Sequence, residues 1–249
     1  MKDKRSGKTF LNKIFKELFP ENYTCDICGA EIYDGNFCPA CLEKLTFNDK
    51  HCCPLCGRKT FRDEICMECK SKPPLFKKAV SAFVYENGAT VLVFKFKNGK
   101  PYLKKLFADK IAEKLVGFPE IDCIVYVPLA KLSAIKRGYN QSRLLATALS
   151  SRILTPVVYG AIRRVKRGRV QKGLTREERA ENVKGAFKVV KREEIKGKSV
   201  LLVDDVMTTG STVNEVSRLL LSAGAKEVFV ATVASVEYLT AEKQAEKET

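Results

Sequence analysis

Short apolar runs alternate with amphipathic segments between about residues 78 and 236. Helical spacing is clearest where Leu103, Phe107 and Ile111 recur on one face. The predicted strands are 79–85, 122–127, 157–158, 200–203 and 227–233, and the predicted helices are 101–116, 139–151 and 212–223. Strands that alternate with helices predict an α/β fold with a mostly parallel sheet flanked by helices. In such folds ligands bind beyond the carboxyl ends of the strands.

The segment VLLVDDVMTTGST at 200–212 departs most from a plain strand-to-helix connection. An apolar strand runs into two carboxylates and then into a turn of hydroxyls and glycine that opens a helix. Backbone amides at a helix start lack partners and carry partial positive charge, so this turn can bind a phosphate. An ordinary capped loop needs only one such polar residue, and a P-loop would have Lys after the glycine. The predicted sugar-phosphate ligands are Asp204, Asp205, Val206, Met207, Thr208, Thr209, Gly210, Ser211 and Thr212.

A second anion-binding loop is predicted at 128–143, PLAKLSAIKRGYNQSR, after the strand 122–127. Lys136, Arg137 and the amides of the following helix could meet a pyrophosphate there. The alternative is a basic loop in which Asn140 caps the helix. The sequence leaves both interpretations open.

Positive charge is concentrated beside these loops. Residues 131–179 contain 13 Lys or Arg against two Glu, a net of +11, and the whole chain carries +16. The segment 163–187 is long for a plain connection, which is typical of lids and binding loops, although a solvated basic face is the simpler alternative. The predicted DNA- or anion-binding residues are Arg163, Arg164, Lys166, Arg167, Arg169, Lys172, Arg176 and Arg179.

Eight of the ten cysteines form four CxxC pairs, arranged as two similar units offset by 28 positions. Each CxxC presents two thiolates to one ion, so two closed four-cysteine sites are predicted, most simply with two structural zinc ions. An iron–sulfur cluster is the competing interpretation, the pairing between the units stays open, and His51 could replace one thiolate. The predicted ligands are Cys25, Cys28, Cys38, Cys41, Cys53, Cys56, Cys66 and Cys69.

With 249 residues and 45% hydrophobic content, the chain can form one domain of ordinary size and a second, smaller domain. The longest apolar run, 228–236, is far below the roughly 18 residues that cross a bilayer, and 10–19 is interrupted by charges. We therefore expect a cytoplasmic protein without a transmembrane segment. The single histidine, His51, lies among the cysteines, which excludes a Ser-His-Asp or Cys-His centre in the larger domain.

Residues 204–212 resemble the fingerprint that binds 5-phosphoribosyl-1-pyrophosphate (PRPP) in type I phosphoribosyltransferases, two acidic residues before a Thr- and Gly-rich turn. The resemblance implies that Asp204 and Asp205 hold the ribose hydroxyls, that 208–212 binds the 5′-phosphate and that Mg²⁺ accompanies PRPP. From 18 to about 235, LFP, paired CxxC units, RGYNQS, NVKGAF and VDDVMTTGST occur in an order similar to the ComF (ComFC) competence protein family. That family joins a zinc ribbon domain to a phosphoribosyltransferase-like domain and is linked to DNA uptake during natural transformation.

The expected organisation is an amphipathic N-terminal helix at 1–20, a double zinc ribbon at 21–72, a phosphoribosyltransferase-like domain at 78–236 and a charged tail at 237–249. The N-terminal helix could pack on the ribbon or touch a membrane or a helicase partner. Two functions follow from these features. The first is a PRPP-binding protein that acts on single-stranded DNA during uptake, and the alternative is an active Mg²⁺-dependent phosphoribosyltransferase whose acceptor the sequence does not reveal.

Overall fold

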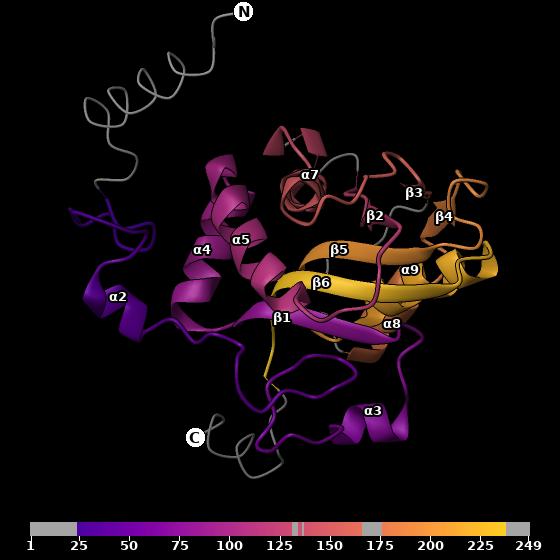
Figure 1. Ribbon diagram of the computed structural model, residues 1–249, viewed down its shortest axis with the longest axis horizontal. Coiled ribbons are helices and arrows are strands. Elements are labelled where there is room, and N and C mark those ends of the chain that lie inside the picture. The colour runs from indigo at the N-terminus through magenta and orange to yellow at the C-terminus, as the bar shows by residue number, and fades with distance from the viewer. Residues whose placement is uncertain (1–23, 131–133, 136, 166–175, 238–249) are drawn as a thin grey trace, which may run out of the picture. The chain divides into compact units, whose positions relative to one another are not determined.

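The computed structural model describes residues 24–130, 134–135, 137–165 and 176–237 (Figure 1). Its contacts divide the chain into two compact units, Met1–Leu45 and Thr46–Thr249. The predicted N-terminal helix at 1–20 and the tail beyond residue 237 lie outside the described residues.

A four-stranded parallel sheet forms the centre of the larger unit, with the strand order β1-β6-β5-β2. This confirms the predicted parallel α/β fold. The strands are β1 Lys78–Val84, β2 Cys123–Tyr126, β5 Ser199–Met207 and β6 Glu227–Ser235. Strand β5 is longer than predicted because the residues after Val203 continue to pair with β6, as far as Met207 opposite Ser235.

Helices cover the sheet, and three of them lie over the same face (Figure 1). These are α4 Asn87–Lys97, α5 Lys104–Leu115 and α7 Gln141–Ile153, with the short 3-10 helix η1 Pro101–Leu103 before α5. Edge-to-face packing of Phe83 and Phe96 on Phe107 joins β1, α4 and α5. Two further helices, α8 Arg176–Val183 and α9 Ser211–Ser222, pack against each other.

Helix α4 was not predicted from the sequence. Its segment, NGATVLVFKFK, is rich in β-branched and aromatic residues, which favour strands over helices. Burial of Ala89, Leu92, Val93 and Phe96 at helical spacing decides the outcome instead.

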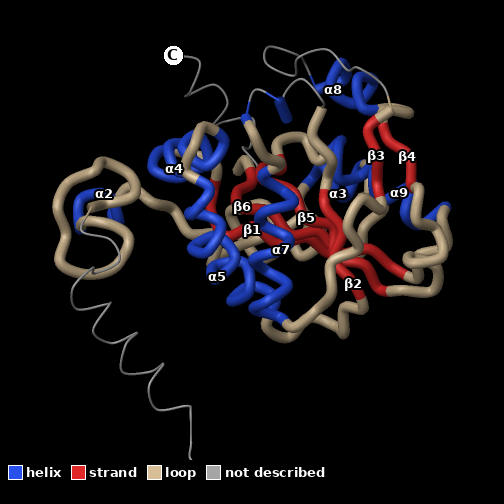
Figure 2. The backbone as a smooth tube through the Cα atoms, turned by 90° about the horizontal axis from the view of Figure 1, so that it is seen from above, coloured by secondary structure: helices blue, strands red, loops and turns tan. Residues whose placement is uncertain are grey.

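The predicted strand at 157–158 is reduced to one bridge between Val157 and Ile124. Two short strands were also not foreseen, β3 Ile162–Arg164 and β4 Phe187–Val189. They form an antiparallel pair that stands apart from the main sheet (Figure 2). β3 and β4 flank the segment 165–186. The two ends of this segment, which was predicted to act as a lid or a binding loop, are therefore held next to each other.

The two cysteine units have different surroundings. The first contains helix α2 Pro39–Glu43 and has its own small core of Cys25, Ile32 and Cys41. The second contains α3 Met67–Ser71, and its four cysteines belong to one buried cluster with α9 and one face of the sheet. The second cysteine unit is therefore built into the core of the larger unit.

Candidate functional site

Two acidic side chains and a phosphate-type turn lie at the carboxyl edge of the sheet. Strand β2 ends opposite Val203, whereas β5 runs on through Asp204 and Asp205 to Met207. The turn 208–210 and helix α9 follow directly. Because β2 and β5 are parallel neighbours, the segments that leave them, 128–143 and 208–212, start from the same edge, as predicted.

The turn has the backbone of an anion cradle. Gly210 adopts the left-handed conformation, with φ 77°, and immediately precedes α9 without a side-chain cap. Thr209 accepts a hydrogen bond from the Ser211 amide at 3.3 Å, and the two side-chain oxygens lie 2.8 Å apart. The first-turn amides of α9 that follow have no acceptor within the helix. Together with the hydroxyls they can bind a phosphate.

Asp204 is the more perturbed of the two carboxylates. Burial, and then the charge of Asp205, raises the pKa of Asp204 to about 7. Hydrogen bonds from the Asp205 amide and the Ser142 hydroxyl, both 2.9 Å, act in the opposite direction. The Asp204 carboxyl therefore changes its charge near neutral pH, which is typical of functional sites.

Asp205 has a cationic partner that the sequence did not reveal. The Lys97 ammonium lies 3.1 Å from the Asp205 carboxylate, at the last residue of α4. Tyr139 fixes this end of the helix, since its hydroxyl donates to the Phe96 carbonyl at 2.5 Å and accepts from the Gly99 amide at 3.1 Å. Lys97 could have been assigned to the site only if helix α4 had been predicted. Ser142, the hydrogen-bond partner of Asp204, already lies in the RGYNQS motif.

The loop 128–143 is described only in part. Asn140 caps α7 by accepting from the Arg143 amide at 3.1 Å, as one interpretation of the sequence expected. Arg137 donates to the Gln141 side chain at 3.3 Å. Lys136 lies outside the described residues. The pyrophosphate role of Lys136 and Arg137 stays a prediction.

The predicted basic surface is spread over several elements. Arg163 and Arg164 lie in β3, and Arg176 and Arg179 lie in α8. The Arg164 guanidinium stacks over Phe187 at 5.3 Å, and burial lowers its pKa. The remaining members, Lys166, Arg167, Arg169 and Lys172, lie outside the described residues.

Each CxxC unit gathers four thiols into one site. The groups are Cys25, Cys28, Cys38 and Cys41, and Cys53, Cys56, Cys66 and Cys69, with the sulfurs of each group within 4.8 Å of one another. This arrangement resolves the pairing that the sequence left open, since each site uses one unit only.

The thiol geometry fits tetrahedral zinc. Zinc–sulfur bonds of about 2.3 Å place sulfurs about 3.8 Å apart. The Cys28–Cys38 and Cys56–Cys66 sulfurs are 3.7 Å apart. His51 belongs to neither group of four thiols and lies 3.4 Å from the Asp63 carboxylate. Four thiolates close each site, which fits a structural role.

Arg58, which follows the knuckle Cys53–Cys56, reaches the phosphate turn. Its guanidinium donates to the Thr208 carbonyl at 2.6 Å and pairs with the Glu68 carboxylate. Arg58 is almost fully buried. Nothing in the sequence distinguishes this arginine from its neighbours, because its partner lies 150 residues away.

Comparison with known proteins agrees with this architecture. The family model for the phosphoribosyl transferase domain matches residues 106–248, and the model for the double zinc ribbon domain matches residues 14–70. A solved glutamine PRPP amidotransferase from B. subtilis is 23% identical over 55% of this chain and 26% of that chain, with a TM-score of 0.34.

Among curated proteins, Competence protein F of Haemophilus influenzae is 42% identical over 110 residues, 44% of this chain and 48% of that protein. The DNA utilization protein YhgH of Salmonella typhi is 34% identical over 166 residues, 64% of this chain and 72% of that protein. Competence protein ComFC of Streptococcus pneumoniae is 33% identical over 135 residues, 54% of this chain and 57% of that protein. The chain thus spans about half the length of Competence protein F.

Among the described residues, no helix combines the length and the apolar character needed to cross a bilayer. A double zinc ribbon with two cysteine tetrads precedes a phosphoribosyltransferase-type parallel sheet. The chain belongs to the phosphoribosyl transferase domain family, among the competence and DNA utilization proteins that include Competence protein F, ComFC and YhgH.

Proposed function

We propose that the carboxyl edge of the sheet binds PRPP or a related sugar phosphate together with Mg²⁺. The observation that carries the proposal is the uncapped start of α9, which follows two carboxylates on β5 through a turn of hydroxyls and Gly210. The turn 208–212 supplies amides and hydroxyls for the 5′-phosphate. Asp204 and Asp205 supply acceptors for the ribose hydroxyls and oxygen ligands for the cation.

Charge balance at the edge suits a ligand with two phosphorylated ends. Lys97 partly neutralises Asp205. Arg137 lies in the loop that follows β2, the strand next to β5, and a pyrophosphate would extend toward this loop. Ionised Asp204 would add a second negative charge beside Asp205, and a bound cation would stabilise that charge. Ligand and cation are therefore expected to bind together.

Titration calorimetry of PRPP with Mg²⁺ tests this proposal. The wild type should bind, and the double variant Asp204→Asn, Asp205→Asn should bind at least about 10-fold more weakly, because it loses both anionic oxygens. Glu193→Gln, an exposed acid in a turn, is the matched control and should bind as the wild type does. Equal affinity of the double variant and the control would refute the site.

The names of the relatives support a role with DNA, and we infer that this chain acts on single-stranded DNA during uptake. Thirteen Lys or Arg against two Glu at 131–179 supply the charge. Counterion release should then dominate binding. Affinity for a single-stranded oligonucleotide should fall about 10-fold or more between 50 and 200 mM salt. Binding that is weak at low salt, or indifferent to salt, would rule this role out.

Phosphoribosyl transfer is the second candidate, and the matching family model favours it. In that reaction an acceptor atom would form a bond to C1′ while pyrophosphate leaves with the bonding electron pair. Arg137 and Lys97 would then stabilise the leaving group by charge. Pyrophosphate release from PRPP by the wild type, screened over nucleobase and amine acceptors, would separate turnover from binding alone.

A further inference from the structure

Arg58 connects the second cysteine site to the phosphate turn. Its guanidinium donates to the Thr208 carbonyl at 2.6 Å, and a side chain on Gly210 would meet the same guanidinium at 3.5 Å. Only 7% of the Arg58 side chain is exposed. The contact therefore fixes the first peptide group of the turn from a buried position.

Both halves of the cysteine site hold this arginine. The Arg58 carbonyl accepts from the Cys53 amide at 2.9 Å, which closes the first knuckle. Glu68, the partner of its guanidinium, lies between Cys66 and Cys69 in the second knuckle. The ion pair thus has its correct geometry only when the two knuckles are held together.

Further contacts join the cysteine unit to α9, which follows the turn, and to β1 at the edge of the sheet. The Leu75 amide, just after the second knuckle, donates to the Asn214 side chain in the first turn of α9 at 2.7 Å. The Ala79 amide in β1 donates to the Leu55 carbonyl at 2.8 Å. The cysteine unit is consequently a fixed support for Arg58.

We propose that Arg58 is a positioning residue for the sugar-phosphate turn, and that it makes ligand binding depend on an intact second cysteine site. By holding the Thr208 carbonyl, Arg58 sets the orientation of the following peptide groups, whose amides face the phosphate. The four thiols at 53–69 fit a zinc ion, which would lock both knuckles and hence the Arg58–Glu68 pair. This inference rests on the proposed sugar-phosphate function.

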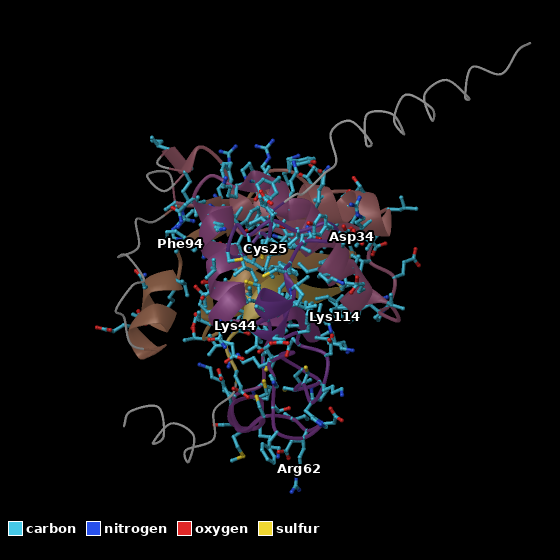
Figure 3. The ribbon with its side chains drawn as sticks, turned by 90° about the vertical axis from the view of Figure 1, so that its left-hand side faces the viewer. Cys25, Asp34, Lys44, Arg62, Phe94 and Lys114 are labelled. Carbon is cyan, nitrogen blue, oxygen red and sulfur yellow. The ribbon has the colours of Figure 1, made fainter. Side chains whose placement is uncertain are left out.

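Substitution of Arg58 tests the positioning role. Arg58→Gln should weaken binding of PRPP with Mg²⁺ about 10-fold or more, because a misplaced turn loses several phosphate contacts at once. Arg58→Lys keeps the charge but cannot serve both partners, so its affinity should fall between that of Arg58→Gln and the wild type. Arg62→Gln is the control, since Arg62 is exposed at the far tip of the second cysteine unit (Figure 3).

A second measurement does not need the ligand. Hydrogen exchange of the turn peptide 208–212 should be faster in Arg58→Gln than in the wild type, while exchange in the buried strands β5 and β6 and the zinc content stay unchanged. Unchanged exchange at the turn would overturn the positioning role, even if PRPP proved not to bind. Faster exchange without any PRPP binding by the wild type would refute the proposed function alone.

Comparison of the two cysteine sites tests the dependence on metal. Cys66→Ser and Cys28→Ser should each lower the zinc content by about one per chain. Only Cys66→Ser should loosen the turn and weaken PRPP binding, because Cys66 is part of the knuckle that holds Glu68. Equal effects of the two substitutions on the turn would contradict the proposal, and the Arg58 variants decide the matter if Cys66→Ser does not fold.

Discussion

Ionisation of the Asp204 carboxyl is expected to lower the stability of the native state. Its pKa rises from 3.8 to about 7 on folding, because the carboxyl is buried next to Asp205. Between these values the native state binds more protons than the unfolded state, so the free energy of unfolding falls as pH rises from about 4 to about 7.

Asp204→Asn removes this term and should stabilise the ligand-free protein by about 1–4 kcal/mol at pH 8, with little gain at pH 4. Urea denaturation at both pH values measures the difference. The surface variant Glu193→Gln controls for a change in net charge. A gain that is equal at both pH values would show that burial does not hold Asp204 protonated.

Lys97 has the opposite effect on the pKa of Asp204. Its charge lowers the pKa of Asp204 and pairs with Asp205. Lys97→Gln should therefore raise the pKa of Asp204 further. The pH midpoint of the carboxyl, followed by carbon-detected NMR, should move upward, and Lys95→Gln on the same helix should move it less. A midpoint that stayed in place would mean that solvent screens Lys97 from the pair.

At the level of elements, each cysteine unit has a glycine after its first knuckle, in the left-handed conformation at Gly29 and Gly57. An added side chain at Gly57 would lie 2.3 Å from the Ala79 carbonyl oxygen in β1, whereas no atom lies within 4 Å of the corresponding position at Gly29. Both glycines therefore need a left-handed backbone conformation, but only Gly57 is closely packed against a neighbouring strand.

Gly57→Ala should destabilise the larger unit by about 3 kcal/mol or more, since overpacking adds to backbone strain. Gly29→Ala carries only the strain of about 1 kcal/mol and should leave unfolding of the larger unit unchanged. Thermal unfolding followed by near-UV dichroism compares them. Similar losses in that transition would show that the second cysteine unit is not packed against β1 as described.

The elements also show how far the sequence predicts the site. Asp204 to Thr212 are contiguous, so a strand, two acids and a turn could be recognised together. The residues missed, Lys97 and Arg58, come from distant segments and reach the site only through packing. Helix α4 illustrates the same limit, because burial of one face overrides the strand preference of its residues.

For the whole molecule, two closed thiol sites predict about two zinc ions per chain. Elemental analysis should find this ratio in the purified protein, and one zinc per chain or bound iron would contradict it. Because the second site belongs to the main buried cluster, a strong chelator should lower the thermal stability of the larger unit. Cys28→Ser protein, which retains the second site, should show the same response to the chelator.

The division of the chain at Leu45 and Thr46 passes between two sequence units that look like copies of each other. The first unit has a small core of its own. The cysteines of the second unit are part of the buried core that includes the sheet. A substitution that changes the packing of the second unit therefore also changes the packing of α9 and of one face of the sheet.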